Sequence, residues 1–224
     1  MTNSDILASF TVHHEDLGIL VVEKPTGLPV IPGRYDTDCL LHRLEAARGE
    51  KLWVVHRIDQ ETSGIVVFAR DAAMHRHLSM AFEKHAVKKR YIALLDGTPK
   101  VKEGRVDAAL RQFGSGRMGV DPAKGKPCTT NYRVIATTRT LSMVEAEPLT
   151  GRRHQLRVHF HHLGTPVAGD PLYGDKERQK TFPRMFLHAQ GIVLPLPDGA
   201  ALRLESPLPA AFTDLGFSVP AWNP

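Results

Sequence analysis

The chain has 224 residues, of which 42% are hydrophobic and 24% are charged. These proportions are typical of a globular protein and exclude a fibrous or largely disordered chain. Lysine and arginine number 29 against 24 acidic residues, and the net charge of +5 favours a polyanionic partner such as a nucleic acid. A basic protein without such a partner is the simpler alternative at this stage.

Cysteine usage and apolar runs indicate a compartment. Cys39 and Cys128 are too few for a disulfide framework, so we expect two reduced thiols. The first ten residues have no basic region followed by a long apolar stretch, as a secretory signal would. No apolar run approaches the ~20 residues that cross a bilayer. We therefore expect a cytoplasmic protein with no membrane partner.

Short apolar runs and turn residues predict the elements of the first half. Residues 1–16 are expected to form a loose N-terminal segment. Buried strands are expected over residues 19–22, 53–55 and 65–68. Asp36 or Asp38 is expected to cap a helix over 40–44, and Asp71 to begin a helix that ends near Lys84.

The second half continues with strands and one further helix. Strands are expected over residues 91–95, 131–136, 141–147, 186–194 and 201–204. Residues 111–127 are rich in glycine and lysine and predict an exposed loop or hairpin. A helix is expected after Gly151 and is expected to end at Gly164. Strands and helices do not alternate regularly, which predicts an α+β fold with a mixed, largely antiparallel sheet and flanking helices.

An acidic residue stands in the polar turn between two of the expected strands. Residues 56–64 read HRIDQETSG and place Asp59 at the mouth of the strands, where scaffolds often hold reactive groups. Aspartate is also a common turn residue, so a purely structural role stays open from these residues alone.

The helix expected after Gly151 has two different faces. Apolar residues at i, i+4 and i+7 form one face, which should be buried: Leu156, Phe160 and Leu163. Basic residues form another face: His154, Arg157 and His161. Such a helix could hold an arginine in a fixed position, and the alternative is a solvated basic face.

Cations also precede a tyrosine at the start of an apolar strand. They are Lys88, Lys89 and Arg90, and Tyr91 follows. Cations beside an aromatic ring can bind phosphates and stack a base. The alternative is a core tyrosine flanked by solvated lysines.

Five segments in this order resemble motifs of the RluA family of pseudouridine synthases. HRIDQETSG at 56–64 is similar to the signature H-R-x-D-x-x-T-S-G, and GRRHQLRVH at 151–159 to G-R-x-H-Q-[IL]-R-V-H. KPTGL at 24–28, KRY at 89–91 and GDPLYG at 169–174 resemble the motifs K-P-x-G-L, K-x-Y and G-D-x-x-Y-G.

The resemblance also gives expected domain limits. It runs from about residue 17 to 212, so we expect an N-terminal segment over 1–16, a catalytic domain over 17–212 and a C-terminal tail over 213–224. VIPGR at 30–34 and GKP at 125–127 resemble the compact branch of the family, which has no S4-like RNA-binding domain.

The resemblance implies a pseudouridine synthase fold and an enzyme that isomerises uridine in stem-loops of tRNA, in the anticodon arm, or of large-subunit rRNA. It implies that Asp59 is the nucleophile, that Arg157 is its ion-pair partner, and that Tyr91 packs on the target uracil. The resemblance implies that the enzyme uses neither a metal nor an organic cofactor. It also implies a monomer whose partner is tRNA or rRNA.

The target uracil must leave its stack to react, at a cost of a few kcal/mol. Arg57 is expected to help fill the space that it vacates. Further RNA contacts are expected from His56, Lys88, Lys89, Arg90, Arg152 and His154.

Two other function classes were compared with this prediction. A metal-dependent hydrolase would use clustered ligands such as His154, His159, His161, His162 and Asp170, but their spacing matches no zinc signature and helical phasing spreads them. A non-catalytic RNA-binding protein would not need Asp59, Tyr91 and Arg157 together. The sequence contains neither a P-loop nor a G-x-S-x-G elbow.

Overall fold

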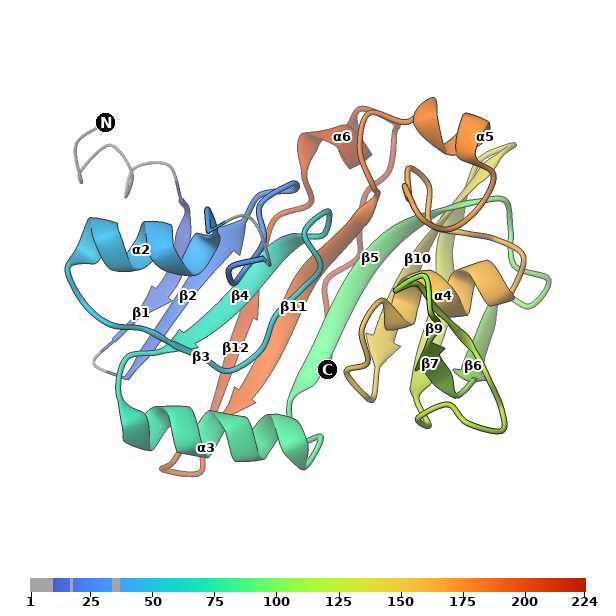
Figure 1. Ribbon diagram of the computed structural model, residues 1–224. Coiled ribbons are helices and arrows are strands. Elements are labelled where there is room, and N and C mark those ends of the chain that lie inside the picture. The colour runs from blue at the N-terminus through green and yellow to red at the C-terminus, as the bar shows by residue number, and fades with distance from the viewer. Residues whose placement is uncertain (1–9, 17, 34–36) are drawn as a thin grey trace. The chain divides into compact units, whose positions relative to one another are not determined.

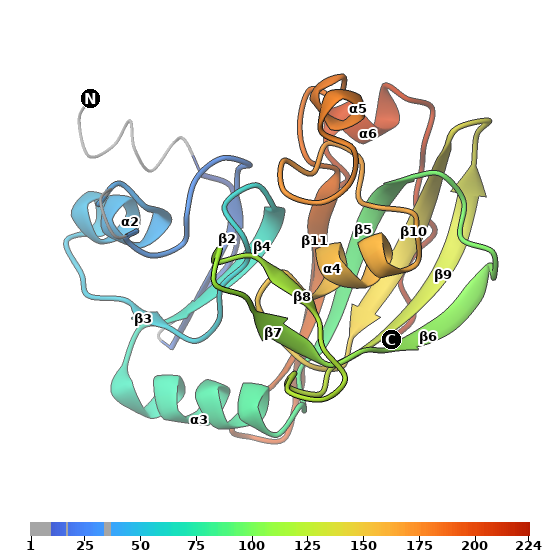
Figure 2. The same cartoon turned by 45° about the vertical axis from the view of Figure 1, so that its right-hand side comes forward.

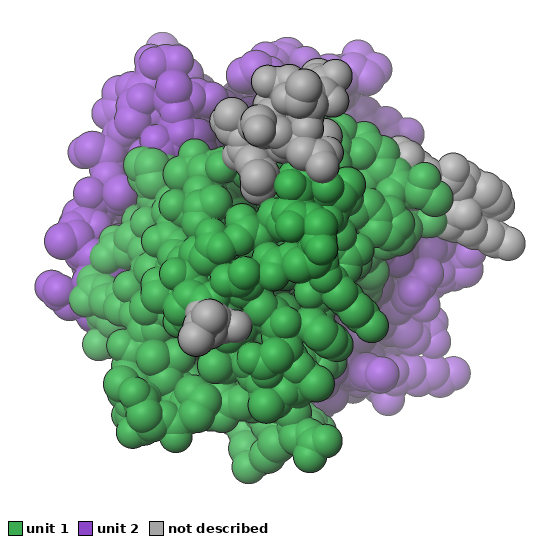
Figure 3. Space-filling view, turned by 90° about the vertical axis from the view of Figure 1, so that its left-hand side faces the viewer, with its two compact units in different colours: residues 1–88, 189–207, 224 green, residues 89–188, 208–223 purple. Residues whose placement is uncertain are grey.

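The computed structural model describes residues 10–16, 18–33 and 37–224. The chain divides into two compact units, which are coloured separately in Figure 3. Unit 1 comprises residues 1–88, 189–207 and 224, and unit 2 comprises residues 89–188 and 208–223.

The described part of unit 1 contains a sheet and two helices (Figure 1). Its strands are β1 (Val12–Glu15), β2 (Ile19–Lys24), β3 (Trp53–Val54), β4 (Ser63–Ala69), most of β11 (Leu187–Pro195) and β12 (Ala201–Glu205). They follow the order β1-β2-β4-β11, with β3 paired to β4 and β12 to β11. The pairs β1–β2, β2–β4, β3–β4 and β11–β12 are antiparallel.

The helices of unit 1 are α2 (Leu40–Arg48) and α3 (Ala72–Glu83). The Asp71 carboxylate accepts a hydrogen bond from Met74 N at 2.8 Å and caps α3. Leu78 and Ala81 of α3 pack with apolar residues of β2, β4 and β11 in one buried cluster. This helix therefore encloses one face of the unit 1 sheet.

Unit 2 contains four antiparallel strands, which we call the unit 2 sheet, and a separate hairpin. Its main strands are β5 (Lys88–Asp96), β6 (Glu103–Asp107), β9 (Thr129–Thr137) and β10 (Leu141–Pro148), in the order β5-β10-β9-β6. The hairpin consists of β7 (Leu110–Gln112) and β8 (Met118–Val120). The helices are α4 (Gln155–His162), α5 (Lys176–Lys180) and α6 (Ala210–Thr213).

Alternation along β5 gives the unit 2 sheet two buried faces. Ala93 and Leu95 pack in one cluster with Phe160 of α4. Ile92 and Leu94 pack in another with Phe212 of α6. Because side chains of a strand alternate between faces, α4 and α6 must cover opposite faces of this sheet. We refer to them as the α4 face and the α6 face.

The structure confirms most of the elements expected from the sequence. The expected strands correspond to β2, β3, β4, β5, β9, β10, β11 and β12. Leu156 and Phe160 are buried, and Gly164 follows α4 in a left-handed conformation, with φ of +80°. Residues 111–127 contain the β7–β8 hairpin.

Some expectations for unit 1 were wrong. Residues 12–15 are not loose, because they pair with β2 as β1. Helix α2 begins after Cys39, and Asp38 binds the Arg43 guanidinium at 2.5 and 2.7 Å instead of capping the helix. Asp36 lies outside the described residues.

Among the helices that the structure describes, none combines the length and the apolar character of a membrane span.

A buried histidine links α4 to the edge of the unit 2 sheet. His159 is fully buried, with Nδ1 2.9 Å from Thr130 Oγ1 and Nε2 3.2 Å from the Ala108 carbonyl oxygen. A carbonyl only accepts, so Nε2 carries the proton and Nδ1 accepts from the Thr130 hydroxyl. The Cys128 thiol donates to the same carbonyl at 3.0 Å. Burial lowers the pKa of His159 and raises the pKa of Cys128 to about 11, so both groups are neutral at pH 7.

We expect this burial to make the protein acid-sensitive. A histidine whose pKa is lowered by folding stabilises the fold above its unfolded pKa of about 6.5, and this stability is lost as the pH falls through the folded pKa. His159→Gln should reduce the slope of unfolding free energy against pH below about 6.5, by up to about 1.4 kcal/mol per pH unit, in urea denaturation. The exposed His162→Gln variant is the control. Equal slopes in wild type and His159→Gln would contradict the prediction.

Candidate active site

Asp59 lies in unit 1, in the turn that leads into β4. It is partly buried, and its carbonyl oxygen accepts a hydrogen bond from Thr62 N at 3.1 Å. Thr62 and Ser63 are buried immediately after it. Because the turn ends in the buried first residue of β4, the backbone that carries Asp59 is fixed to the sheet.

A buried lysine holds this turn in place. Lys24 is 0% exposed, and its Nζ donates to the carbonyl oxygens of Pro25, Leu28 and Gln60 at 2.8, 2.6 and 2.8 Å. An ammonium group is removed from water only where hydrogen bonds replace its hydration. The Gln60 carbonyl also accepts from Gly27 N at 2.8 Å. Lys24 thus fixes the backbone next to Asp59, a role that the KPTGL motif alone does not reveal.

The end of the turn requires a glycine. Gly64 has φ of +117°, and a Cβ there would lie 2.3 Å from the carbonyl oxygen of Ala189 in β11. Any side chain at this position would therefore collide with backbone and also strain φ. The glycine of the HRIDQETSG segment allows the close approach of β4 and β11 within unit 1.

The two residues at the start of the turn differ in role. Arg57 is exposed, and its proposed contact with RNA stays a prediction. His56 was also expected to contact RNA, and this contact stays a prediction, although the residue has a structural role. Its Nε2 accepts from Val67 N of β4 at 3.0 Å, and its ring stacks on Phe82 with centroids 4.8 Å apart. His56 therefore joins α3 to β4 as a structural residue.

Strand β5 separates the four residues of the KKRY segment onto two faces. Tyr91 is partly buried and packs against the cluster that includes α4, so it lies on the α4 face. Arg90 lies on the other face and is 0% exposed, with its guanidinium bound to the Glu145 carboxylate at 2.5 to 2.8 Å. The expected RNA contact by Arg90 is therefore wrong, because strand alternation turns this side chain into the protein interior.

The two lysines of this segment are not equivalent. Lys88 is exposed. Lys89 shares the α4 face with Tyr91, and its Nζ donates to the Thr150 carbonyl oxygen at 3.1 Å. Burial lowers the pKa of Lys89 to about 8, so its ammonium loses its proton more readily than that of an ordinary lysine. RNA contacts by both lysines stay predictions.

Arg157 forms a buried ion pair within unit 2. Its Nε and Nη2 donate to the two carboxylate oxygens of Asp170 at 2.7 and 2.8 Å, and both side chains are at most 2% exposed. Asp170 Oδ1 also accepts from the backbone N–H groups of Leu172 and Tyr173 at 2.8 and 3.1 Å. Asp170 thus fixes the plane of the Arg157 guanidinium, and a solvated basic face is excluded for Arg157. The pairing of Arg157 with Asp59 joins residues of different units and stays a prediction.

The segment before α4 presents further basic side chains. Arg152 is exposed, and its contact with an RNA phosphate stays a prediction. His154 has φ of +54°, which is unusual for a residue other than glycine, and its Nδ1 lies 2.9 Å from Tyr173 Oη. His154 is therefore the residue before the helix and not a member of its basic face.

The histidines do not converge as a metal site would require. His159 is held by Thr130 and Ala108, and Asp170 is held by Arg157. In the described ranges, no three histidine, cysteine, aspartate or glutamate side chains gather as possible ligands of one metal ion.

Breaking the buried pair should destabilise the protein strongly. Asp170→Asn keeps the shape of the side chain but leaves the Arg157 guanidinium buried beside a neutral amide. We expect a loss of about 3 kcal/mol in the unfolding free energy, measured by urea denaturation. Asp214→Asn, at an exposed site, is the control and should change stability by less than about 0.5 kcal/mol. Similar losses in both variants would contradict a structural role for the pair.

Known proteins resemble this chain over most of its length. Residues 18–162 match the family of RNA pseudouridylate synthases. An uncharacterized RNA pseudouridine synthase of Zymomonas mobilis is 41% identical over 209 residues, covering 90% of this chain and 95% of its own. The dual-specificity RNA pseudouridine synthase RluA of Escherichia coli (strain K12) is 36% identical over 203 residues, covering 87% and 91%.

Other relatives agree in sequence and in structure. The ribosomal large subunit pseudouridine synthase D of Zymomonas mobilis is 34% identical over 217 residues, covering 87% of this chain and 68% of its own. The structure of human RNA pseudouridylate synthase domain containing 4 superposes with a TM-score of 0.80 at 27% identity, covering 98% of this chain and 97% of that one. The expected α+β pseudouridine synthase fold is confirmed, and the chain belongs to the RluA-type RNA pseudouridine synthases.

Proposed function

We propose that this enzyme isomerises uridine to pseudouridine with Asp59 as its nucleophile. The observation that carries the proposal is the immobilised turn of unit 1, in which buried Lys24 and its carbonyl partners hold the backbone beside Asp59. A carboxylate that must attack a sugar or base carbon benefits from such fixed positioning.

The reaction exchanges one bond to the sugar for another. The bond from C1′ to N1 of uracil breaks, the base turns, and a bond from C1′ to C5 forms. C5 then loses its proton and N1 gains one, so the atoms balance without an oxidant or a cofactor. Asp59 holds either the sugar C1′ or the base in a covalent adduct, and Tyr91 packs on the uracil and assists proton removal from C5.

Arg157 is proposed to orient Asp59. A guanidinium has five N–H donors, and Asp170 uses two of those of Arg157. The pair fixes the plane in which the others point, which suits a second carboxylate. Removal of Arg157 should therefore disturb both the interior of unit 2 and the position of the nucleophile.

RNA contacts are proposed for the cations that the structure leaves at or near the surface. These are Arg57, Lys88, Lys89 and Arg152, and His154 is proposed as a further contact. Among the relatives, RluA is named for dual specificity and synthase D for the large ribosomal subunit. We propose the same substrate classes here, tRNA and large-subunit rRNA, for a monomeric enzyme of the cytoplasm.

The role of Asp59 as nucleophile is tested by replacing one of its carboxylate oxygens with an amide nitrogen. Asp59→Asn should reduce pseudouridine formation below detection while RNA affinity stays within about tenfold, because an amide keeps the shape but is not a nucleophile. Pseudouridine is measured by carbodiimide-dependent primer extension on total RNA. Glu61→Gln makes the same change two residues away in the same turn and should stay active. Turnover by verified Asp59→Asn protein would remove Asp59 from the mechanism.

Substrate breadth is tested with isolated hairpins. We expect a tRNA anticodon stem-loop and a stem-loop of large-subunit rRNA to be modified nearly as well as the full RNAs, because loop shape and splayed bases provide most RNA recognition of this kind. Modification of only one hairpin would restrict the enzyme to one substrate class. Activity on total RNA without activity on either hairpin would show that recognition needs more than the loop.

A further inference from the structure

The β7–β8 hairpin needs support from elsewhere in unit 2. A two-stranded hairpin is at best marginally stable alone in water. Here Leu110 at the base of β7 packs in a buried cluster with Val158 of α4 and Tyr173, and Met118 packs against the same cluster. Figure 2 shows the hairpin on the same side of β9 and β10 as α4. The hairpin is therefore held on the α4 face, which is the face of Tyr91.

Tyr173 connects this hairpin to the Arg157–Asp170 pair. The phenol oxygen accepts from Met118 N of β8 at 3.2 Å, and it lies 2.9 Å from His154 Nδ1. The guanidinium groups of Arg117 and Arg157 both lie over the tyrosine ring, 4.8 and 5.3 Å from its centroid. One buried side chain thus contacts the hairpin, the residue before α4 and the buried ion pair.

The tip of the hairpin exposes an aromatic ring beside cations. Phe113 is 40% exposed although it is apolar, and the Arg111 guanidinium lies 4.6 Å from its ring centroid. Arg111 Nε is 3.0 Å from Asp121 Oδ2, which orients the guanidinium. Gly119 lies against one edge of the ring, because a Cβ there would be 2.9 Å from Phe113 Cε2. The ring is therefore supported from within the hairpin while part of it faces solvent.

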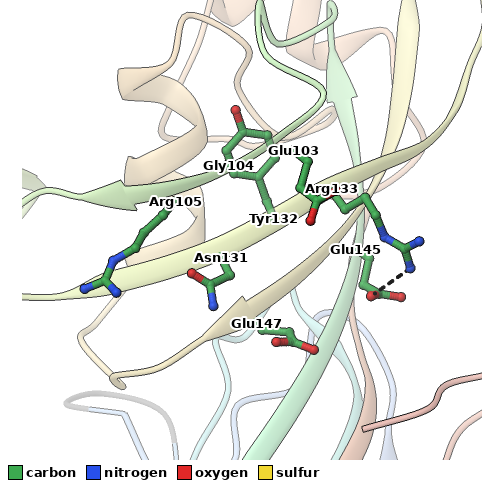
Figure 4. A pocket seen from close by; sticks show the side chains of 8 residues that line it. All are labelled: Glu103, Gly104, Arg105, Asn131, Tyr132, Arg133, Glu145 and Glu147. Atoms are coloured by element: carbon green, nitrogen blue, oxygen red, sulfur yellow. Dashed lines mark hydrogen bonds and ion pairs between the residues drawn. The ribbon is translucent and has the colours of Figure 1, made fainter.

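Charge distinguishes this surface from the other side of the unit 2 sheet. Residues 110–127 carry four basic side chains and one acidic one, and Arg117, Lys124 and Lys126 are exposed. Figure 4 shows a hollow formed by β6, β9 and β10, which contains three glutamates, Glu103, Glu145 and Glu147. Of its two arginines, Arg133 is paired with Glu145 at 3.3 Å, and Arg105 with Asp107 at 2.7 Å. The hollow does not suit a polyanion, whereas the hairpin does.

We propose that the β7–β8 hairpin is an RNA-binding arm in which Phe113 and Arg111 stack an unpaired base of the substrate loop. Base–aromatic stacking combined with cations is the usual means of holding single-stranded RNA without reading its sequence. Lys124 and Lys126 would meet the phosphates that flank this base. Tyr173 is then a positioning residue, because it holds the arm in register with Arg157. The inference rests on the proposed function for the identity of the RNA.

The stacking contact is tested by binding, which does not require turnover. Affinity for a fluorescein-labelled tRNA anticodon stem-loop is measured by fluorescence anisotropy. Phe113→Ala should weaken binding about tenfold, as expected for one lost base–aromatic stack, and Phe113→Trp should restore it. Leu215→Ala removes an apolar side chain that is 45% exposed outside the hairpin and should stay within about twofold.

The salt dependence separates stacking from charge. Phe113→Ala should leave the slope of log affinity against log salt unchanged, because stacking of a base on a phenyl ring releases no counterions from the RNA. The double variant Lys124→Ala, Lys126→Ala should flatten the slope, whereas Arg139→Ala, at an exposed arginine outside the hairpin, should not. Wild-type affinity in Phe113→Ala would overturn the proposal.

The role of Tyr173 is tested by coupling. Tyr173→Phe keeps the ring beside Arg157 but removes the phenol oxygen that accepts from β8. If Tyr173 positions the arm, Tyr173→Phe should lower RNA affinity less in the Phe113→Ala background than in wild type. Equal effects in both backgrounds would overturn the positioning role. Pseudouridine formation by wild type tests the proposed function separately, so the loss of either conclusion can be recognised.

Discussion

The ion pair between Arg157 and Asp170 is the contact on which unit 2 depends. Two charges are held almost entirely out of water, and this is tolerated only where each oxygen and each donor finds a partner. Asp170 meets the requirement with two backbone N–H groups besides the guanidinium. One set of hydrogen bonds therefore joins helix α4 to the segment 169–174. Tyr173 extends this set to the hairpin.

Lys24 has a comparable position in unit 1. Its ammonium group replaces water with three carbonyl oxygens, and one of them belongs to the turn of Asp59. Lys24 and Gln60 lie 36 residues apart in the chain, but their hydrogen bond makes the two motifs one local structure. Both units thus use a buried cation to hold a loop. In unit 1 that loop includes Asp59, which the family resemblance makes the nucleophile, and in unit 2 the cation is Arg157 itself.

The sequence predicted apolar elements well and polar geometry less well. Strands such as β4 and helix α3 were predictable because their burial period is visible in the apolar residues, and Asp71 marked the start of α3 correctly. Strand β6 was missed because Val106 is the one buried residue of the strand and its neighbours Arg105 and Asp107 are charged and exposed. The motif residues Asp59, Tyr91 and Arg157 came from the family resemblance, and their joint action is not derivable from periodicity.

Basic residues show why the positions of the charged side chains could not be predicted from the sequence. Lys24, Arg90 and Arg157 are all buried, so they add to the formal charge of the chain without contributing to a surface that RNA can reach. A sequence gives the sign of each charge but not the face of the strand on which it falls, as Arg90 and Tyr91 illustrate in adjacent positions. His56 was similarly ambiguous, since an imidazole can bind RNA or accept a backbone N–H group.

The path of the chain between the units has a consequence for folding. Unit 1 is completed by residues 189–207 and unit 2 by residues 208–223, so neither is encoded by one uninterrupted stretch. A nascent chain that has emerged as far as residue 188 has neither Ile192 and Leu194 of β11 for the unit 1 core nor Phe212 for the α6 face of unit 2. Contacts of such long sequence separation form slowly, because loop closure comes before the interactions that offset it. Until residues 189–223 have emerged, the apolar strands of both units are open to association with other chains, and the arrival of these residues decides when that exposure ends.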